Sequence, residues 1–592
     1  MCGITGIVYG DSERSVESGL IERMCEVIHH RGPDEWGMWH DGAVGIGMKR
    51  LQIIDLAGGH QPMASADYRL RIVFNGEIYN YRELRQQLES RGCSFRTSSD
   101  TETILYAYQE YGEECVAHLR GMFAFAIWDE RKRSLFMARD RFGKKPLHYL
   151  HDGSKLVFGS EIKSILQHPE VTAEVHRPAV ARYLSYGYVP DPDTMFRGIS
   201  KLPPGHSLSW KDGQVTVRQY WDLGFEPDDP PRDEVFYLDE IDRLLREAVK
   251  IRLVSDVPLG AFLSGGIDSS LVVAMMALQM GEPVKTFSIG FDQKEYNELP
   301  YARQVAKKYG TDHHEEIVKP DAEAVLPEII SNFDEPFADS SAIPTFYVSR
   351  LARRYVTVAL SGDGGDELFG GYGRYCDSRL AEHIDRWPQW VKGPLLGGVA
   401  RLLPESAQGI NTLRYLAADA DSRYAAKMTG KLTYRFRRVF SAELREAMGD
   451  YLPGAEVLAS LQAQSGLHKI ARRQYADVKN YLAGDILTKV DRTSMLVSLE
   501  ARAPLLDHRL AEAAACIPSA LKNRNRSLKY VLKALAYRYL PHELIERPKM
   551  GFAIPIRHWI NHEWRDLSHD LVLSQRALQR NNINPVYLRQ AF

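Results

Sequence analysis

The chain has 592 residues, 44% of them hydrophobic, which is too long for a single core, so we expect two or more domains. Lys and Arg (75) nearly balance Asp and Glu (77), and the net charge of −2 argues against a nucleic-acid-binding protein. We also expect a cytoplasmic enzyme without a membrane partner, a zinc site or disulfides, because no apolar run could span a bilayer, no signal peptide is evident, and the six cysteines lack C-x-x-C spacing.

The first notable residue is Cys2, which directly follows Met and precedes Gly3. Removal of the initiator by Met aminopeptidase would leave a residue with both a thiol and a free α-amine. The amine, with a pKa of about 7.7–8.0, can accept the thiol proton, so one residue supplies nucleophile and base. A cysteine here is also compatible with chance, and the neighbouring motifs must decide.

The region from 4 to about 205 is rich in short β patterns and turns. Strands are expected at 4–9, 44–48, 70–74 and 123–128, and helices at 18–28 and 80–91. Polar clusters lie between them at 30–34, 50–55, 75–80 and 98–102. The acidic, proline-rich segment 226–231 can continue neither a helix nor a central strand, and it is the best linker candidate.

The second half begins with an amphipathic helix over 238–249 and a buried strand over 257–263. The strand leads into Ser-Gly-Gly-Ile-Asp-Ser-Ser at 264–270, and a helix over 271–277 follows. A strand, a Gly/Ser loop and a helix together can hold a phosphate group. The loop lacks the lysine of the kinase-type phosphate loop. A turn that binds no ligand is the plain alternative.

Two more strands, 284–291 and 355–360, are followed by polar segments, and the second leads into a glycine- and aspartate-rich stretch at 361–372. Alternating strands and helices predict a parallel, doubly wound sheet, which binds ligands at the carboxyl ends of its strands. We therefore expect the polar loops to converge on one nucleotide.

Taken together, these motifs resemble a known family. Met-Cys-Gly-Ile, His-Arg-Gly-Pro-Asp, Arg-Leu-x-Ile-x-Asp, Phe-Asn-Gly-Glu-Ile-Tyr-Asn and Ser-Asp-Thr-Glu, in this order, resemble the class II glutamine amidotransferase domain. With Ser-Gly-Gly-x-Asp-Ser downstream, the whole chain resembles the glutamine-hydrolysing asparagine synthetase family. The resemblance implies an α+β N-terminal nucleophile hydrolase domain of stacked antiparallel sheets between helices (1–210), a linker (211–234) and an α/β doubly wound ATP-pyrophosphatase domain (235–592). It also suggests a homodimer.

The resemblance implies a role for each matching residue of the first domain. Cys2 would be the nucleophile, and Asn75 and Gly76 would bind glutamine and donate hydrogen bonds to the oxyanion. Glutamine is a zwitterion, so its carboxylate needs a cation, for which Arg50 is suited, and its ammonium needs anions, for which Glu77 and Asp100 are suited. For Arg31 and Asp34, a structural turn is at least as well supported as substrate contact.

In the second domain the resemblance implies sites for ATP and Mg²⁺. Asp268 and Asp366 would bind the metal, since Mg²⁺ prefers one or two carboxylates plus phosphate oxygens. Asp363 would support the intermediate and deprotonate ammonia, although some family members carry Glu there. Lys549 would stabilise the reacting phosphorus and the departing pyrophosphate. The implied ATP site comprises Leu263, Ser264, Gly265, Gly266, Asp268, Ser269, Ile289, Ser361 and Gly362.

The implied reaction adenylates aspartate with ATP and transfers glutamine-derived ammonia through an internal passage, giving asparagine, glutamate, AMP and pyrophosphate. One alternative keeps both half-reactions but uses another carboxylate acceptor, such as a cell-wall peptide, a polysaccharide precursor or a secondary metabolite. A non-catalytic binding protein is a further alternative, whereas the related β-lactam synthetase lacks the N-terminal cysteine and does not fit.

Three other segments have less definite roles. The segments 139–147 and 158–163 match the family and should maintain the fold near the second domain. The charged signature over 481–507 either lies beside the acceptor or braces helices, and the latter is slightly favoured. The stretch 390–470 is expected to be helical, with no recognisable chemistry.

Overall fold

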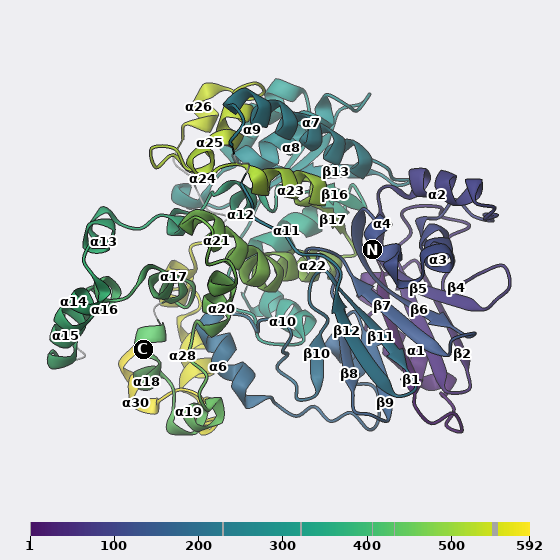
Figure 1. The fold of residues 1–592 in the computed structure, drawn as a ribbon, viewed down its shortest axis with the longest axis horizontal. Helices are drawn as coiled ribbons and strands as arrows, with labels where there is room; N and C mark the ends of the chain where they lie inside the picture. Colours follow the sequence, from purple (N-terminus) through teal and green to yellow (C-terminus); the bar gives the residue numbers. More distant parts are fainter. Residues whose placement is uncertain are drawn as a thin grey trace.

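The computed structural model describes residues 2–227, 230–319, 322–404, 407–430, 432–547 and 554–591. A β-rich N-terminal half lies beside a more helical C-terminal half, and the two are in direct contact (Figure 1). Each half corresponds to one of the two folds that the sequence predicts.

The first half contains two six-stranded sheets in which every pair of neighbouring strands is antiparallel. The first sheet has the order β10-β8-β9-β1-β3-β2, with β1 (Gly3–Tyr9), β2 (Glu35–Asp41), β3 (Val44–Arg50), β8 (His148–His151), β9 (Lys155–Gly159) and β10 (Ile199–Lys201). The second has the order β12-β11-β7-β6-β5-β4, with β4 (Met63–Ala64), β5 (Leu70–Ile78), β6 (Gly121–Asp129), β7 (Ser134–Arg139), β11 (His206–Lys211) and β12 (Gln214–Gln219). Because β12 pairs with β11, this sheet extends into the segment 211–234 that the sequence analysis treats as a linker.

The two sheets pack face to face through apolar side chains, because successive residues of a strand point to opposite faces and the inner faces of both sheets are apolar. Ile4, Val8 and Ile46 from the first sheet share one buried cluster with Val73 and Ala126 from the second. On its other face, the first sheet packs against α1 (Ser18–Glu26), and the second packs against α2 (Tyr81–Ser90) and α3 (Asp100–Tyr111). This helix–sheet–sheet–helix arrangement confirms the fold predicted for the first domain.

The second half is built on a five-stranded parallel sheet with the order β15-β14-β13-β16-β17. Its strands are β13 (Leu259–Phe262), β14 (Lys285–Gly290), β15 (Asp312–Ile317), β16 (Val358–Leu360) and β17 (Glu500–Arg502). Helices around it include α7 (Glu234–Arg252), α8 (Ile267–Ala277), α9 (Leu299–Tyr309), α10 (Ala322–Phe333), α11 (Ala342–Arg353), α12 (Gly365–Phe369), α22 (Thr488–Met495), α23 (His508–Cys516) and α25 (Tyr530–Ala536). Ala261 and Leu360 belong to a different apolar cluster from Phe287 and Ala359, so both faces of the sheet are covered, as predicted for a doubly wound sheet.

The order of the strands reverses between β13 and β16, and the loops that follow these two strands diverge there. Such a switch point creates a crevice at the carboxyl end of the sheet, where open α/β folds bind ligands. The helices from α13 (Arg379–Ile384) to α20 (Ala455–Ala463) extend away from this sheet (Figure 1). No helix in the described part of the chain is both long and apolar enough to cross a lipid bilayer.

Candidate active site

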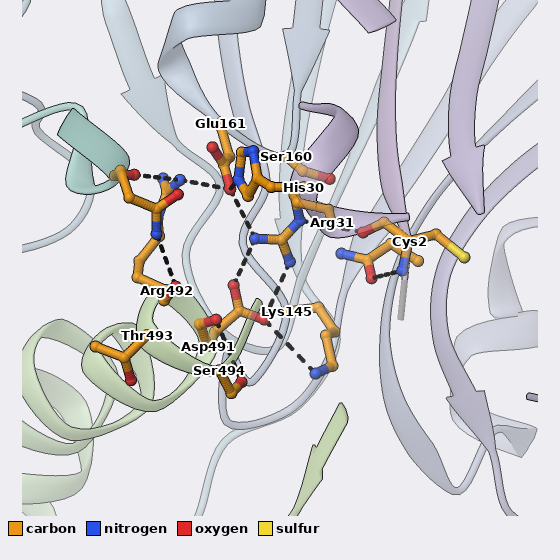
Figure 2. Close-up of polar contacts among 12 residues, drawn as sticks. Cys2, His30, Arg31, Lys145, Ser160, Glu161, Asp491, Arg492, Thr493 and Ser494 are labelled. Carbon is orange, nitrogen blue, oxygen red and sulfur yellow. Dashed lines mark hydrogen bonds and ion pairs between the residues drawn. The ribbon is translucent and has the colours of Figure 1, made fainter. Parts of the chain in front are cut away.

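Cys2 lies at the start of β1, inside the first half of the molecule. The register of β1 with β3 pairs Gly3 with Lys49, which places Cys2 beside the position of Arg50 at the end of β3. The Cys2 side chain is buried, and its backbone nitrogen donates a hydrogen bond to Oδ1 of Asn75 at 3.0 Å (Figure 2). Burial raises the pKa of the Cys2 thiol. The thiol therefore needs a nearby base before it can act as a nucleophile.

The predicted oxyanion donors lie at the end of β5, next to Cys2. Asn75 is fully buried, and among the described residues its Nδ2 has no hydrogen-bond partner. A buried donor without a partner is costly, so a substrate oxygen at this position would relieve an existing penalty. Gly76 has φ +152°, and a Cβ there would lie 2.0 Å from the backbone oxygen of Met122. Only glycine fits this close approach between β5 and β6.

Arg50 is buried and already has protein partners. Its guanidinium donates to Glu35 at 2.8 Å and to the backbone oxygen of Asp55 at 2.8 Å. These contacts fix the orientation of the guanidinium, and a planar guanidinium can bind a carboxylate through two parallel hydrogen bonds. Glu35 was not singled out from the sequence, although it directly follows the His-Arg-Gly-Pro-Asp motif.

Glu77 and Asp100 supply buried carboxyl groups near Asn75. Burial, together with the charges of Glu500 and Asp100, raises the pKa of Glu77 well above its ordinary value. Burial also raises the pKa of Asp100 to about 6, although its carboxylate accepts a 2.9 Å hydrogen bond from the backbone nitrogen of Ile78. A bound ammonium group would stabilise the ionised form of both carboxyl groups.

Of the two less certain residues in this domain, Asp34 accepts a 2.9 Å hydrogen bond from the backbone nitrogen of Gln52, which fits the structural-turn interpretation. Arg31 lies at the contact between the two domains, as described below.

A cavity of about 900 Å³ opens at the carboxyl end of the parallel sheet. It is lined by most of the residues of the predicted ATP site: Leu263, Ser264, Gly266, Asp268, Ser269, Ile289, Ser361 and Gly362. The three expected segments therefore converge on one space. The N-terminus of α8 follows the loop directly, so its partial positive charge is available to an anion.

Gly265 is not among the cavity-lining residues and has a structural reason to be glycine. It adopts φ +71°, and a Cβ there would lie 2.7 Å from the backbone nitrogen of Ala302. The residue therefore lets the loop pack closely against α9.

The two carboxylates predicted to bind Mg²⁺ approach the same cation, the ammonium group of Lys529. Lys529 contacts Asp366 at 2.8 Å and also forms an ion pair with Asp268. The pair is thus able to hold one positive charge between them. Within the described part of the chain, no group of three or more His, Cys, Asp or Glu side chains could hold a metal, so Mg²⁺ would need phosphate oxygens to complete its coordination. Lys529 was missed because an isolated lysine in a sequence carries no distinctive signal.

Asp363 follows β16 and faces both the cavity and α22. The Ser361 hydroxyl donates to its carboxylate at 2.7 Å, and burial raises the pKa of Asp363. Across the cavity, Lys489 of α22 donates to Asp339 at 2.5 Å and to Ser341 at 2.7 Å. One side of the large cavity, which we call the mixed-charge side, is therefore formed by Asp339, Ser341, Asp363 and Lys489.

Lys549 lies outside the described residues. Arg547, two positions earlier, donates to the backbone oxygen of Gly265 at 3.0 Å and forms a 3.1 Å ion pair with Glu298. The chain therefore reaches the phosphate-loop region just before Lys549.

A second cavity, of about 20 Å³, lies between Asp363 and the first domain. It is lined by Lys144, Lys145, Ser361, Asp363, Leu487, Val490, Asp491, Ala501 and Ala503. This volume is enough for one water-sized molecule. Burial lowers the pKa of Lys144 to about 7.

The two domains meet through buried ion pairs (Figure 2). Glu161 of the first domain contacts Arg492 at 2.9 Å, and Arg31 contacts Asp491 at 2.9 Å. Lys144 donates to the backbone oxygen of Leu506 at 2.7 Å. These contacts confirm that 139–147 and 158–163 lie at the face of the second domain. Within the signature over 481–507, Asp491 and Arg492 form ion pairs across the interface, which fits the bracing role, and Lys489 lines the large cavity. A place beside the acceptor stays a prediction.

Comparisons with known proteins cover nearly the whole chain. A family model described as asparagine synthase matches residues 240–592, and a glutamine amidotransferase domain model matches residues 1–221. The chain is 37% identical to asparagine synthetase [glutamine-hydrolyzing] 1 of Bacillus subtilis, over 97% of this chain and 90% of that protein. It is 37% identical to a putative asparagine synthetase of Mycobacterium tuberculosis, over 95% of this chain and 88% of that protein. It is also 29% identical to amidase chry2 of Gibberella zeae, over 94% of this chain and 90% of that protein.

Proposed function

Because the chain belongs to the glutamine-hydrolysing asparagine synthetase family, we propose that it converts aspartate to asparagine with glutamine as the nitrogen donor and ATP as the energy source. The observation that carries the proposal is the pairing of two sites in one chain. A buried cysteine with an unpartnered amide donor lies in one domain, and a nucleotide-sized cavity lies in the other. A small cavity lies between them, against Asp363.

In the first domain, the Cys2 thiolate would attack the side-chain amide of glutamine. A thioester forms, ammonia leaves, and water then releases glutamate. The Asn75 Nδ2 group and the Gly76 N–H would donate to the oxyanion. With Met1 removed, the nitrogen that donates to Asn75 would be an amine able to take the thiol proton, which offsets the raised pKa of the buried thiol.

Substrate orientation would come from three charged groups. Arg50, held by Glu35, would bind the carboxylate of glutamine, and Glu77 and Asp100 would bind its ammonium group. The raised pKa values of these two carboxyl groups support this role, because a bound cation would reduce the cost of ionising them.

In the second domain, a carboxylate oxygen of aspartate would attack the α-phosphorus of ATP and displace pyrophosphate. Ammonia would then attack the acyl adenylate and displace AMP, and Asp363 would accept the proton. Its raised pKa favours proton acceptance. Asp268 and Asp366 would hold Mg²⁺, and the bound metal would neutralise charge on the pyrophosphate. We retain Lys549 as a cation for the same group, since Arg547 brings the chain to this loop.

Ammonia would pass between the domains through the region of the small cavity. Free ammonia released into water at neutral pH would be protonated and lose its nucleophilicity. A water-sized space that touches both Lys145 and Asp363 supports an enclosed route.

The acceptor is tested by incubating the protein with glutamine, ATP and Mg²⁺, with and without aspartate, and measuring AMP, pyrophosphate and asparagine. We expect aspartate-dependent pyrophosphate matched by asparagine. Relatives named amidases align over nearly the whole chain, so the glutamine and ATP motifs do not by themselves specify the acceptor. Glutamate release without aspartate-dependent pyrophosphate would favour another carboxylate acceptor.

A further inference from the structure

Helix α22 connects the large cavity with a residue that contacts Cys2. Helix α22 carries Lys489, which lines the large cavity, and Asp491, which contacts the first domain. Two residues span about 200° around an α-helix, so the two side chains leave it on nearly opposite sides. The helix therefore links the large cavity to the first domain through two side chains that are two positions apart.

The contact on the first-domain side ends at the nucleophile. Nη1 and Nη2 of Arg31 donate to the two carboxylate oxygens of Asp491 at 2.9 and 3.1 Å. Nε of the same guanidinium donates to the backbone oxygen of Cys2 at 3.1 Å. Figure 2 shows Arg31 between the Asp491 carboxylate and Cys2, with the Cys2 sulfur pointing away from this contact. The nitrogen side of Cys2 is held by Asn75, so Arg31 fixes the other side of the residue.

Both ends of this contact are buried, which makes its geometry specific. Arg31 is fully buried and Asp491 is 4% exposed. Burial alone would raise the pKa of Asp491, but the positive charges of Arg31 and Lys145 outweigh burial and hold this pKa below its ordinary value. Glu161 also contacts Arg31, at 2.8 Å, but only through Nη1. A bidentate pair fixes the plane of a guanidinium, whereas one hydrogen bond leaves it able to rotate.

We propose that Asp491 is a positioning residue for the nucleophile: it fixes Arg31 against the Cys2 carbonyl, so that α22 couples the mixed-charge side of the large cavity to the glutaminase centre. The inference rests on the proposed function, since it assumes that Cys2 hydrolyses glutamine. It adds a residue of the second domain to the machinery of the first.

The test compares Asp491→Asn with Asp334→Asn in the full-length protein. Asp334 is a matched control because it is a buried carboxylate of the same interface that forms ion pairs with Lys163 at 3.3 Å and Arg492 at 3.5 Å rather than with Arg31. For Asp491→Asn we expect glutaminase kcat to fall about tenfold with KM for glutamine nearly unchanged, because the nucleophile is misplaced while the substrate contacts remain. Ammonia-dependent synthesis should persist in both variants, and glutaminase should persist in Asp334→Asn.

A second measurement tests the coupling. Glutaminase is assayed with and without ATP and aspartate, and we expect the ratio of the two rates to differ between the wild-type protein and Asp491→Asn. Equal ratios, wild-type kcat in Asp491→Asn, or an equal loss in Asp334→Asn would each overturn the inference. If Asp491→Asn does not fold, the same kcat and KM measurements are made on Arg31→Lys, which keeps the positive charge but loses the bidentate contact with Asp491. Wild-type glutaminase kcat in Arg31→Lys would overturn the inference. A wild-type protein that releases no glutamate would instead refute the proposed function.

Discussion

The two proposed reaction centres differ in how far the protein has already oriented their charged groups and in how much empty space they contain. At Cys2, nearly every charged group is already oriented by a protein partner: Arg50 by Glu35, and Asp100 by the backbone of Ile78. The synthetase centre is instead an open cavity of about 900 Å³ whose two key carboxylates hold a lysine. Glutamine is a small zwitterion with one reactive bond, and it suits a rigid, prearranged site. ATP is a polyanion that binds together with Mg²⁺, so its site needs space and counter-charges that can move.

The strongest test of this separation is removal of the nucleophile. Cys2→Ala should lower glutamine-dependent synthesis by at least about 10³-fold, because the covalent step is lost. Ammonia-dependent synthesis should remain, since the cavity of the second domain is untouched. Both rates are measured as asparagine formed with glutamine or with ammonium salt. Equal loss of both would show that Cys2 is not a dedicated glutaminase nucleophile.

The reciprocal variant is Asp268→Asn, which removes one of the two carboxylates around Lys529. We expect ATP/pyrophosphate exchange to fall about 10²- to 10³-fold, because the Mg²⁺ that would bind the pyrophosphate loses one of its two carboxylate ligands. Basal glutaminase should be unchanged, since the residue lies in the other domain. Unchanged ATP turnover would remove Asp268 from the proposed metal site.

Rigidity at the first centre is tested by Gly76→Ala. The added Cβ would meet the Met122 oxygen at 2.0 Å, so β5 must shift at the oxyanion donors. We expect a loss of about 10²-fold in glutaminase kcat, because donor geometry controls that step. Gly281→Ala is the control, since a Cβ there meets nothing within 4 Å. Wild-type kcat in Gly76→Ala would show that the strand adapts.

A smaller effect is expected from pH. The pKa of Asp100 is raised to about 6, so its ammonium-binding anionic form is present above that pH and is lost as the pH falls through it. At pH values well below this pKa, KM for glutamine should therefore rise by about tenfold for each pH unit by which the pH falls. The measurement is KM as a function of pH, with Asp100→Asn as the comparison. A wild-type profile as flat as that of the variant would exclude Asp100 from ammonium recognition.

Sequence patterns predicted the framework well because its signals are local. Short β patterns identified β1, β3, β5 and β6, and the alternation of strands and helices predicted the parallel, doubly wound sheet, although not the order of its strands. Loops after parallel strands share one sheet edge, so their convergence on a cavity could also be predicted.

Contacts between residues far apart in the chain could not be predicted in this way. Lys529 and Asp268 are 261 positions apart, and Arg31 and Asp491 are 460 apart. A single lysine or aspartate has no periodicity that identifies its partner. The length of the antiparallel sheet was also underestimated, because β12 (Gln214–Gln219) is mostly exposed and lacks the buried face that marks a strand.

The lysine between Asp268 and Asp366 has a consequence for metal binding. Lys529 offsets one of the two negative charges, so these carboxylates attract a free divalent ion less strongly than two unpaired carboxylates would, and a metal bound between them would displace the ammonium group. A nucleotide supplies the phosphate oxygens that receive this ammonium. Mg²⁺ should therefore bind more tightly together with ATP than it does alone.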